Sequence, residues 1–378
     1  MSVGLTFAFA VVGLARAEGP PSPQQVVVSA CRPTADLIAF EGQNSKSRPA
    51  ATSKATTFYS NALLHSMAGE SERAIEQYDR AIGLDPEIAS YYYGRGTVRL
   101  KTRHFDRALE DFRRATTLNP KSSMAFYGRG QAYAGINEYD RAIEDLNEAI
   151  RLLPGNSAAY AIRGSAYIGK REYDRAIADT DQAIKLDPTC YVGFTYRAIA
   201  YDFKGDRDRA AADYAKVVEL IPSPETADAY VWRSIAYLYK RDYVRAIHDL
   251  GRALALEPRN TSALTNSCRA HAIVGFFEKA LEHCNEALRI QPNNPVAFDS
   301  RGFTYLKMGS LDDAIAAYDD ALRIDPKKAV SLLGRGAAKR KKGETEAGDA
   351  DVAAAKALRP NVEEELARFG IKVKGREP

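Results

Sequence analysis

The sequence lacks the features that mark membrane-spanning, nucleic-acid-binding and catalytic proteins. It contains no apolar run near the roughly 20 residues that cross a bilayer. It has no Gly-rich phosphate loop, no Gly-x-Ser-x-Gly and no His-Glu-x-x-His. Its 53 basic and 49 acidic residues leave a formal net charge of +4, too balanced to indicate nucleic acid binding. We therefore expect a non-enzymatic protein with no cofactor, no nucleic acid partner and no transmembrane segment.

Repetition is abundant instead. Proline recurs every 34 residues, with one interval of 36 between Pro222 and Pro258, at Pro86, Pro120, Pro154, Pro188, Pro222, Pro258, Pro292, Pro326 and Pro360. A fixed period of this length indicates a two-helix unit that is copied and stacked, because a single unit cannot bury its own apolar face. We number the copies from 1 to 9 and count each of these prolines as position 32 of its copy.

Other positions repeat with the proline. Position 8 is small, position 20 is alanine in eight copies and position 27 is alanine in eight, while positions 4 and 24 are mostly aromatic or large. In copy 3, for example, Phe126, Gly130 and Tyr133 share one helical face, and Ala142 and Ala149 share another. Small residues let two antiparallel helices approach closely, and large residues fill the space beside them. Proline then ends the second helix.

This pattern resembles the tetratricopeptide repeat family, over nine copies from Ala55 to about Pro360. The resemblance implies an all-α, right-handed superhelical solenoid of nine helix-turn-helix repeats. Residues 361–378 are expected to form a capping helix and tail. Asn361 would start the helix, and Leu366 and Phe369 would cover the open face of copy 9.

The chain departs from the family pattern at position 7, which is usually leucine. Arginine occupies position 7 and aspartate occupies position 23 together in six copies, whereas copies 1 and 7 have neither. This covariation predicts ion pairs within a copy, because a half-buried arginine needs an acidic partner. A ligand-binding arginine ladder is the alternative. The predicted pairs are Arg95 with Asp111, Arg129 with Asp145, Arg163 with Asp179, Arg197 with Asp213, Arg233 with Asp249, and Arg335 with Asp351.

Copy 7 holds the only concentration of reactive side chains, namely Cys268, His271, His283 and Cys284. The cysteines replace a small residue at position 8 and an aromatic residue at position 24, so two buried thiols are the favoured interpretation. A disulfide between Cys268 and Cys284 is the second possibility in an oxidising compartment. A metal site is the third, and we assign no metal ligands.

A second stripe of apolar residues follows the first helix of each copy, at positions 5, 9 and 12. In the family these positions line the concave side of the superhelix, where partner peptides bind. Exposed apolar surface over many copies implies a partner, although packing against the adjacent helix is the competing explanation. The predicted partner-binding groove contains Tyr59, Leu63, Tyr93, Leu100, Tyr127, Ile168, Ile199, Val231, Ile235, Leu238, Phe303 and Leu306.

The N-terminal residues differ from the repeats. Residues 1–17 combine an apolar run with Ala15-Arg16-Ala17, which is typical of a bacterial signal peptide cleaved after Ala17. Met1 to Gly4 holds no basic residue, which leaves open a start codon further upstream. Residues 18–54 are predicted to be a flexible linker. A lipoprotein box ending at Cys31 is disfavoured, because polar residues separate it from the apolar run.

We therefore expect an exported bacterial protein, periplasmic or secreted, that acts as a non-enzymatic scaffold binding a protein or peptide in a concave groove. The inner positions lack the Lys and Asn of the family's carboxylate clamp, and position 6 lacks the asparagine ladder of the sugar-transferring relatives. The alternatives are a metal or redox protein that uses copy 7, and the substrate-recognition subunit of an envelope enzyme complex.

Overall fold

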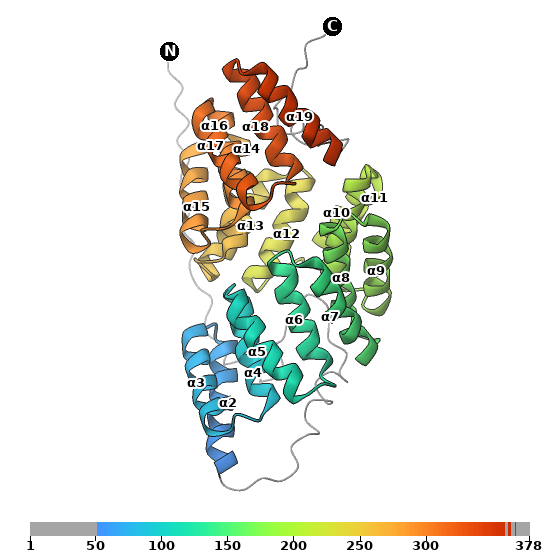
Figure 1. Ribbon diagram of the computed structural model, residues 1–378, viewed down its shortest axis with the longest axis vertical. Helices are drawn as coiled ribbons and strands as arrows, with labels where there is room; N and C mark the ends of the chain where they lie inside the picture. The colour runs from blue at the N-terminus through green and yellow to red at the C-terminus, as the bar shows by residue number, and fades with distance from the viewer. Residues whose placement is uncertain (1–50, 360–361, 364–366, 368–378) are drawn as a thin grey trace, which may run out of the picture.

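The computed structural model describes residues 51–359, 362–363 and 367. In this part of the chain it has eighteen α-helices and no strand, arranged as nine antiparallel pairs (Figure 1). The first helices of the pairs, which we call A helices, are α2(Ala51–Met67), α4(Ala89–Lys101), α6(Ser123–Gly135), α8(Ser157–Gly169), α10(Tyr191–Lys204), α12(Ala227–Tyr239), α14(Thr261–Val274), α16(Pro295–Met308) and α18(Ala329–Lys342). The second or B helices are α3(Ser71–Leu84), α5(Phe105–Leu118), α7(Tyr139–Leu152), α9(Tyr173–Leu186), α11(Arg207–Leu220), α13(Tyr243–Leu256), α15(Phe277–Ile290), α17(Leu311–Ile324) and α19(Thr345–Leu358).

Repeated local signals set the helix ends. The residue before an A helix often caps it: the side chains of Ser122, Asn156 and Asn260 each accept a hydrogen bond from a backbone N–H three residues later. Position 15 ends each A helix in the left-handed backbone region. Glycine occupies it in copies 1, 5, 7, 8 and 9, whereas Arg103, Asn137, Arg171 and Arg241 occupy it in the others.

Packing follows the order of the chain. Each helix packs against its neighbours in sequence, and each A helix also contacts the A helix of the next copy. The alanines at positions 20 and 27 are buried throughout copies 1 to 4. At position 8 the helices meet so closely that a Cβ on Gly96 would lie 2.9 Å from the ring of Phe112. These neighbour-to-neighbour contacts make the molecule a solenoid of tetratricopeptide type.

The solenoid also winds back on itself. Arg171 in copy 4 donates hydrogen bonds to the carbonyl oxygens of Lys327, at 2.9 Å, and Leu358. Lys101 in copy 2 lies 3.1 Å from Glu257, and the Arg359 guanidinium lies 4.1 Å from the ring centroid of Phe203 in copy 5. The end of α19 accordingly lies beside α10 in Figure 1. These contacts join the turns between A and B helices of copies 2, 4 and 5 to copies 6 to 9.

The N-terminal boundary differs from the predicted one. Helix α2 begins at Ala51, so residues 51–54, which we predicted to be linker, belong to the first helix. The predicted signal peptide, with Ala17, and the rest of the predicted linker, with Cys31, lie outside the described residues.

The predicted cap is described only in part. Asn361, Leu366 and Phe369 lie outside the described residues. Val362 is helical and fully buried, and it packs with the copy 9 core that includes Val352 and Ala355. The sequence interpretation did not single out Val362, yet this residue covers the apolar end of copy 9.

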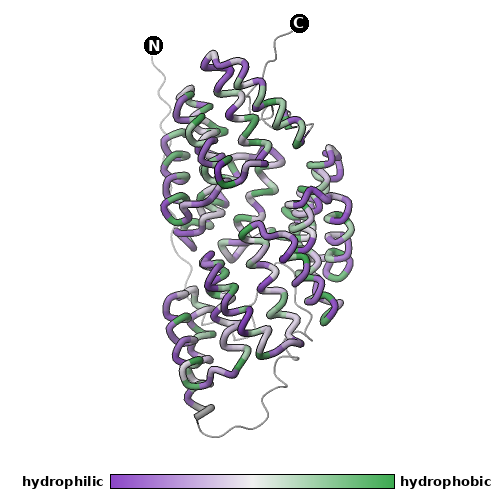
Figure 2. The backbone as a smooth tube through the Cα atoms, viewed as in Figure 1, coloured by the Kyte–Doolittle hydropathy of each residue, from purple (hydrophilic) through white to green (hydrophobic). Residues whose placement is uncertain are grey.

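Hydrophobic and hydrophilic residues alternate along each helix, without a long hydrophobic segment (Figure 2). Among the described residues, no helix has the length and apolar character needed to cross a membrane.

Candidate interaction surfaces

The arginine–aspartate pairs lie inside the copies, between the A and B helices. The shortest N–O distance is 2.6 Å for Arg95–Asp111, 2.5 Å for Arg335–Asp351, and 2.7 Å for Arg129–Asp145, Arg163–Asp179, Arg197–Asp213 and Arg233–Asp249. The aspartates are buried, with only 2% of the Asp111 side chain exposed. Burial alone would raise the pKa of Asp351, but Arg335 and Lys339 hold that pKa below its ordinary value.

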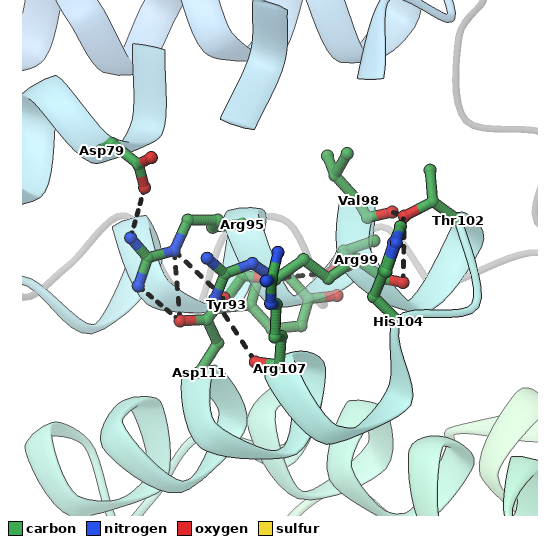
Figure 3. Close-up of polar contacts among 10 residues, drawn as sticks. Asp79, Tyr93, Arg95, Val98, Arg99, Thr102, His104, Arg107 and Asp111 are labelled. Atoms are coloured by element: carbon green, nitrogen blue, oxygen red, sulfur yellow. Dashed lines mark hydrogen bonds and ion pairs between the residues drawn. The ribbon is translucent and has the colours of Figure 1, made fainter. Parts of the chain in front are cut away.

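Each arginine reaches the preceding copy as well. Arg95 bonds Asp79 of copy 1 at 2.5 Å in addition to Asp111 (Figure 3). The equivalent second acceptors, at position 25 of the preceding copy, are Asn147 for Arg163, Asp181 for Arg197 and Asp319 for Arg335. In five of the six pairs the guanidinium also lies over the aromatic residue at position 4, as Arg163 lies 5.4 Å from the ring centroid of Tyr160. These arginines thus link neighbouring copies.

Sequence reasoning missed the second acceptor. The signal is present, because Asp79, Asn147, Asp181 and Asp319 all occupy position 25. It could be found by comparing each position with the positions of the next copy as well as with those of its own copy.

Copy 7 replaces the ion pair with a covalent link. Cys268 and Cys284 form a disulfide between α14 and α15, with their Cα atoms 5.4 Å apart, and both are fully buried. The favoured expectation was two buried thiols, because the cysteines replace a small and an aromatic residue of the repeat, and the disulfide was the second possibility. The short Cα separation shows that positions 8 and 24 face each other in copy 7.

The histidines of copy 7 lie beside that disulfide. The rings of His271 and His283 are 5.4 Å apart. Burial, together with the neighbouring His271, lowers the pKa of His283 to about 4. Within the described residues, no group of three or more His, Cys, Asp or Glu side chains could hold a metal ion.

The predicted groove residues separate into a group that reaches the surface and a group that is buried. Tyr59, Tyr93, Leu100, Tyr127, Ile168, Ile199, Ile235 and Leu238 are half-buried, and Leu63 is exposed. Val231, Phe303 and Leu306 are buried in the core. Phe303 lies beneath Arg269, whose guanidinium is 4.7 Å from its ring centroid. The proposed groove therefore excludes Val231, Phe303 and Leu306, and it ends before copy 8.

The half-buried tyrosines pack on their neighbours with one face. The Tyr59 ring lies 5.0 Å from that of Tyr91 in copy 2, and the Tyr93 ring lies 6.0 Å from that of Phe112. Tyr196 and Trp232, in copies 5 and 6, meet edge to face at 5.5 Å. Sequence reasoning placed these last two residues at position 6 but did not assign them to the groove. Each of these side chains thus packs on a neighbouring ring and is still partly exposed.

A crevice of about 690 Å³ opens where the windings face each other. The turns of copies 2 and 3 contribute Arg103, Arg107 and Ile136, and copies 7 and 8 contribute Asn293 and Val296. Burial lowers the pKa of Arg103. Nothing in the repeat pattern indicates this crevice, because it depends on how tightly the solenoid winds.

Stacked two-helix units, internal polar links and half-exposed aromatic side chains on the A helices together define a repeat solenoid of the protein-interaction class. The tetratricopeptide repeat profile matches residues 59–123, 93–157, 127–190, 197–255 and 233–295, and a second profile of the same repeat matches residues 297–328. The chain belongs to the tetratricopeptide repeat family.

Solved structures share this fold. The APC/C hetero-tetramer Cut9-Hcn1 is similar with a TM-score of 0.56 and 13% identity, covering 88% of this chain and 80% of that chain. MamA from Desulfovibrio magneticus RS-1 has 24% identity and a TM-score of 0.41, covering 46% of this chain and 98% of its own. TTC0263, a protein of Thermus thermophilus, has 23% identity and a TM-score of 0.43, covering 49% of this chain and 99% of its own. No curated protein matches the sequence.

Proposed function

We propose that the chain is a non-enzymatic scaffold that binds a protein or peptide along the A helices of copies 1 to 6. The observation that carries the proposal is the row of half-exposed aromatic side chains formed by Tyr59, Tyr93, Tyr127, Tyr196 and Trp232. Tyrosine and tryptophan supply most of the binding energy at many protein interfaces, because they offer a large contact area with few rotatable bonds.

Packing on one face prepares these rings for binding. The edge-to-face contact of Tyr196 with Trp232 restricts both side chains before a partner arrives, so less conformational entropy is lost on association. The Tyr196 hydroxyl is protonated at neutral pH, as in any tyrosine, and burial raises its pKa further to about 12. A protonated hydroxyl can donate a hydrogen bond to a backbone carbonyl oxygen of the partner.

We also propose that the protein is exported to the bacterial periplasm or secreted. The signal-peptide pattern of residues 1–17 supports this, and so does the Cys268–Cys284 disulfide, because disulfides persist in oxidising compartments. N-terminal sequencing of the protein purified from the periplasm should begin at Glu18. Retention of residues 1–17 in a cytoplasmic protein would contradict export.

The binding surface is tested by replacing Tyr127 and Tyr196 with alanine together. We expect partner capture from an envelope extract, measured by mass spectrometry after pull-down, to be lost. The circular dichroism spectrum should change little, because neither side chain is among the fully buried residues, although loss of two partly buried rings should lower the melting temperature.

A matched control is Tyr173→Ala, a half-buried tyrosine at the turn of copy 4. This variant should keep partner capture. If the Tyr127 and Tyr196 variant captures the same proteins as the wild type, or loses capture only because it unfolds, the groove is assigned wrongly.

A further inference from the structure

The turns between A and B helices form one edge of the solenoid, and neighbouring copies are joined there by ion pairs. Position 14 of one copy meets position 18 of the copy before it. Lys170 lies 2.6 Å from Asp140, Lys342 lies 2.7 Å from Asp312, and Lys204 pairs with Asp174. An ion pair thus joins these two positions at three of the eight junctions between copies in the described residues.

The junction of copies 6 and 7 has two apolar residues at these positions. Val244 and Val274 occupy positions 18 and 14 there, and they are 81% and 38% exposed. Phe276, two residues further along the same turn, is 64% exposed, and Met308 at position 14 of copy 8 is 42% exposed. The edge of copies 6 to 8 therefore carries an apolar patch that includes two positions joined by an ion pair at three other junctions.

Arg241 lies at one end of this patch in a costly conformation. Its φ is 60°, in the left-handed region, at the position where five copies have glycine. A left-handed backbone is strained for a residue with a Cβ. Strain of this kind tends to persist where a side chain has a function.

The equivalent residues in other copies use their side chains within the molecule. Arg103 donates to the Ser262 hydroxyl at 3.2 Å, Asn137 accepts from the Tyr139 hydroxyl at 2.7 Å, and Arg171 joins two windings. In the part of the chain that the structure describes, Arg241 makes no side-chain hydrogen bond or ion pair. The same holds for its exposed neighbour Lys240.

We propose that Val244, Val274, Phe276 and Met308, with Lys240 and Arg241 at one end, form a second docking surface. It fits an amphipathic protein segment that presents apolar side chains and, at the copy 6 end, aspartate or glutamate. The proposal rests on the scaffold function stated above and adds a separate surface to it. The two cations supply charge complementarity at that end, and the acidic Glu278, exposed beside the other end, sets the orientation of the segment.

The position of this edge in the superhelix fits the proposal. The contacts that join the windings come from the turns of copies 2, 4 and 5, which face the next winding. The turns of copies 6 to 8 belong to that later winding. A partner segment would cover this edge as the later winding covers the turns of the earlier copies.

The test uses two variants that the other copies show to be compatible with the fold. Val244→Asp with Val274→Lys installs the ion pair found at Asp140 and Lys170, with the acid near the start of α13 and the base near the end of α14, where helix dipoles favour them. Arg241→Gly installs the residue that five copies have at position 15 and relieves the strained backbone. Both variants should melt at or above the temperature of the wild type.

Random peptides displayed on phage are selected on the wild-type protein, and the affinities of enriched peptides are measured by fluorescence anisotropy. We expect enriched sequences that combine apolar residues with Asp or Glu. Their affinity should fall about tenfold or more on Arg241→Gly, the loss expected for a charged hydrogen bond, and binding should disappear on the double valine variant.

The remaining outcomes overturn the proposal in distinguishable ways. Some peptides could bind the wild type and the double valine variant equally but fail to bind the variant lacking Tyr127 and Tyr196. That result would support the scaffold function and contradict this second surface. Enrichment without acidic residues, or no enrichment, would also overturn it. Self-association of the wild type in sedimentation velocity, abolished by the double valine variant, would show that a second copy of this chain covers the edge instead.

Discussion

At the scale of single residues, the arginine at position 7 joins its own copy to the preceding one. Arg163 bonds both carboxylate oxygens of Asp179 at 2.7 Å and the side-chain oxygen of Asn147 at 2.6 Å. Only 17% of the Arg163 side chain and 11% of the Asp179 side chain are exposed. Removing one partner of such a pair leaves the other charge buried and uncompensated, which costs more than the pair itself contributes.

We therefore expect Arg163→Ala to lower the free energy of unfolding by about 3–5 kcal/mol, the range found for a broken buried pair. The double change Arg163→Met with Asp179→Leu should recover much of that loss, because it leaves no buried charge. Urea denaturation of the single and double variants measures the coupling energy. Zero coupling between the two sites would contradict the pair.

The second prediction at this scale concerns His283. Its pKa of about 4 in the folded protein is below the ordinary value of 6.5, because of burial and the adjacent His271. Between these two pH values the unfolded chain binds a proton at this residue and the folded chain does not. Stability should therefore be unaffected by His283 above pH 6.5 and should fall as the pH drops from 6.5 toward 4.

Replacing His283 with glutamine keeps a polar side chain but removes the titration. Urea denaturation of wild type and variant at about pH 7.5, 5.5 and 4.5 should show a smaller loss of stability for the variant. His248→Gln is the control, because that imidazole is largely exposed. Equal pH dependence in the His283 variant and the wild type would refute the assignment.

These residues show what the sequence could predict locally. Covariation of positions 7 and 23 identified partners that share a copy, because both lie on facing helices of one repeating unit. It did not identify Asp79 or Asn147, which belong to the preceding copy. The disulfide was placed second because the relative rotation of α14 and α15 decides whether Cys268 faces Cys284, and periodicity alone does not fix that rotation.

At the scale of helices, three of the four aromatic residues at position 24 are followed by glycine at position 6 of the next copy, and the fourth, Tyr214, is followed by Trp232 across the longer interval. Where position 24 is the aromatic Tyr78, Phe112 or Tyr318, the following copy has Gly94, Gly128 or Gly334. A Cβ on Gly128 would lie 2.6 Å from the Phe112 ring. The glycine thus makes room for a ring that projects from α5 onto α6.

Gly128→Ala should accordingly destabilise the protein by about 1–3 kcal/mol, the usual cost of overpacking, although alanine is the better helix former. Adding Phe112→Leu should remove the clash and restore part of the stability, since Leu146 and Leu250 occupy the same position in other copies. Thermal melting followed by circular dichroism measures both. The idea fails if the single change is neutral or if the second change brings no recovery. Gly83→Ala, where a Cβ would meet no atom within 4 Å, is the control.

Most helices were predictable because each one carries the same small and large residues in the same register and ends at a proline or a left-handed residue. The first helix was not bounded correctly. Residues 51–54 precede copy 1, so no repeated position marks the start of α2 at Ala51.

At the scale of the whole molecule, the winding of the solenoid could not be predicted from the repeat. Curvature adds up from small rotations between copies, and these depend on side-chain details such as those at positions 6 and 24. The longer interval before copy 6 also changes a joint: Arg233 bonds the carbonyl oxygens of Ile221 and Pro222 at 3.0 and 2.7 Å rather than a side chain at position 25. The crevice and the contacts between windings follow from this accumulated geometry.

The contacts of Arg171 and Arg359 hold the last winding against copies 4 and 5. Arg171 bonds the carbonyl oxygens of Lys327 and Leu358, and Arg359 lies 4.0 Å from Asp202. Each copy is otherwise stabilised by its direct neighbours. Changing Arg171 to glycine and Arg359 to alanine should therefore open the superhelix and increase the radius of gyration in small-angle X-ray scattering, while the helix content by circular dichroism stays the same.

Arg241→Gly provides the matched control for this prediction. It makes the same arginine-to-glycine change at the same position of copy 6, where the described residues show no bond between windings, so the radius of gyration should not change. If the Arg171 and Arg359 variant scatters like the wild type, direct packing between neighbouring copies alone sets the winding. An increase in both proteins would instead assign the effect to the glycine backbone, because the two variants share that change and differ in the lost contacts.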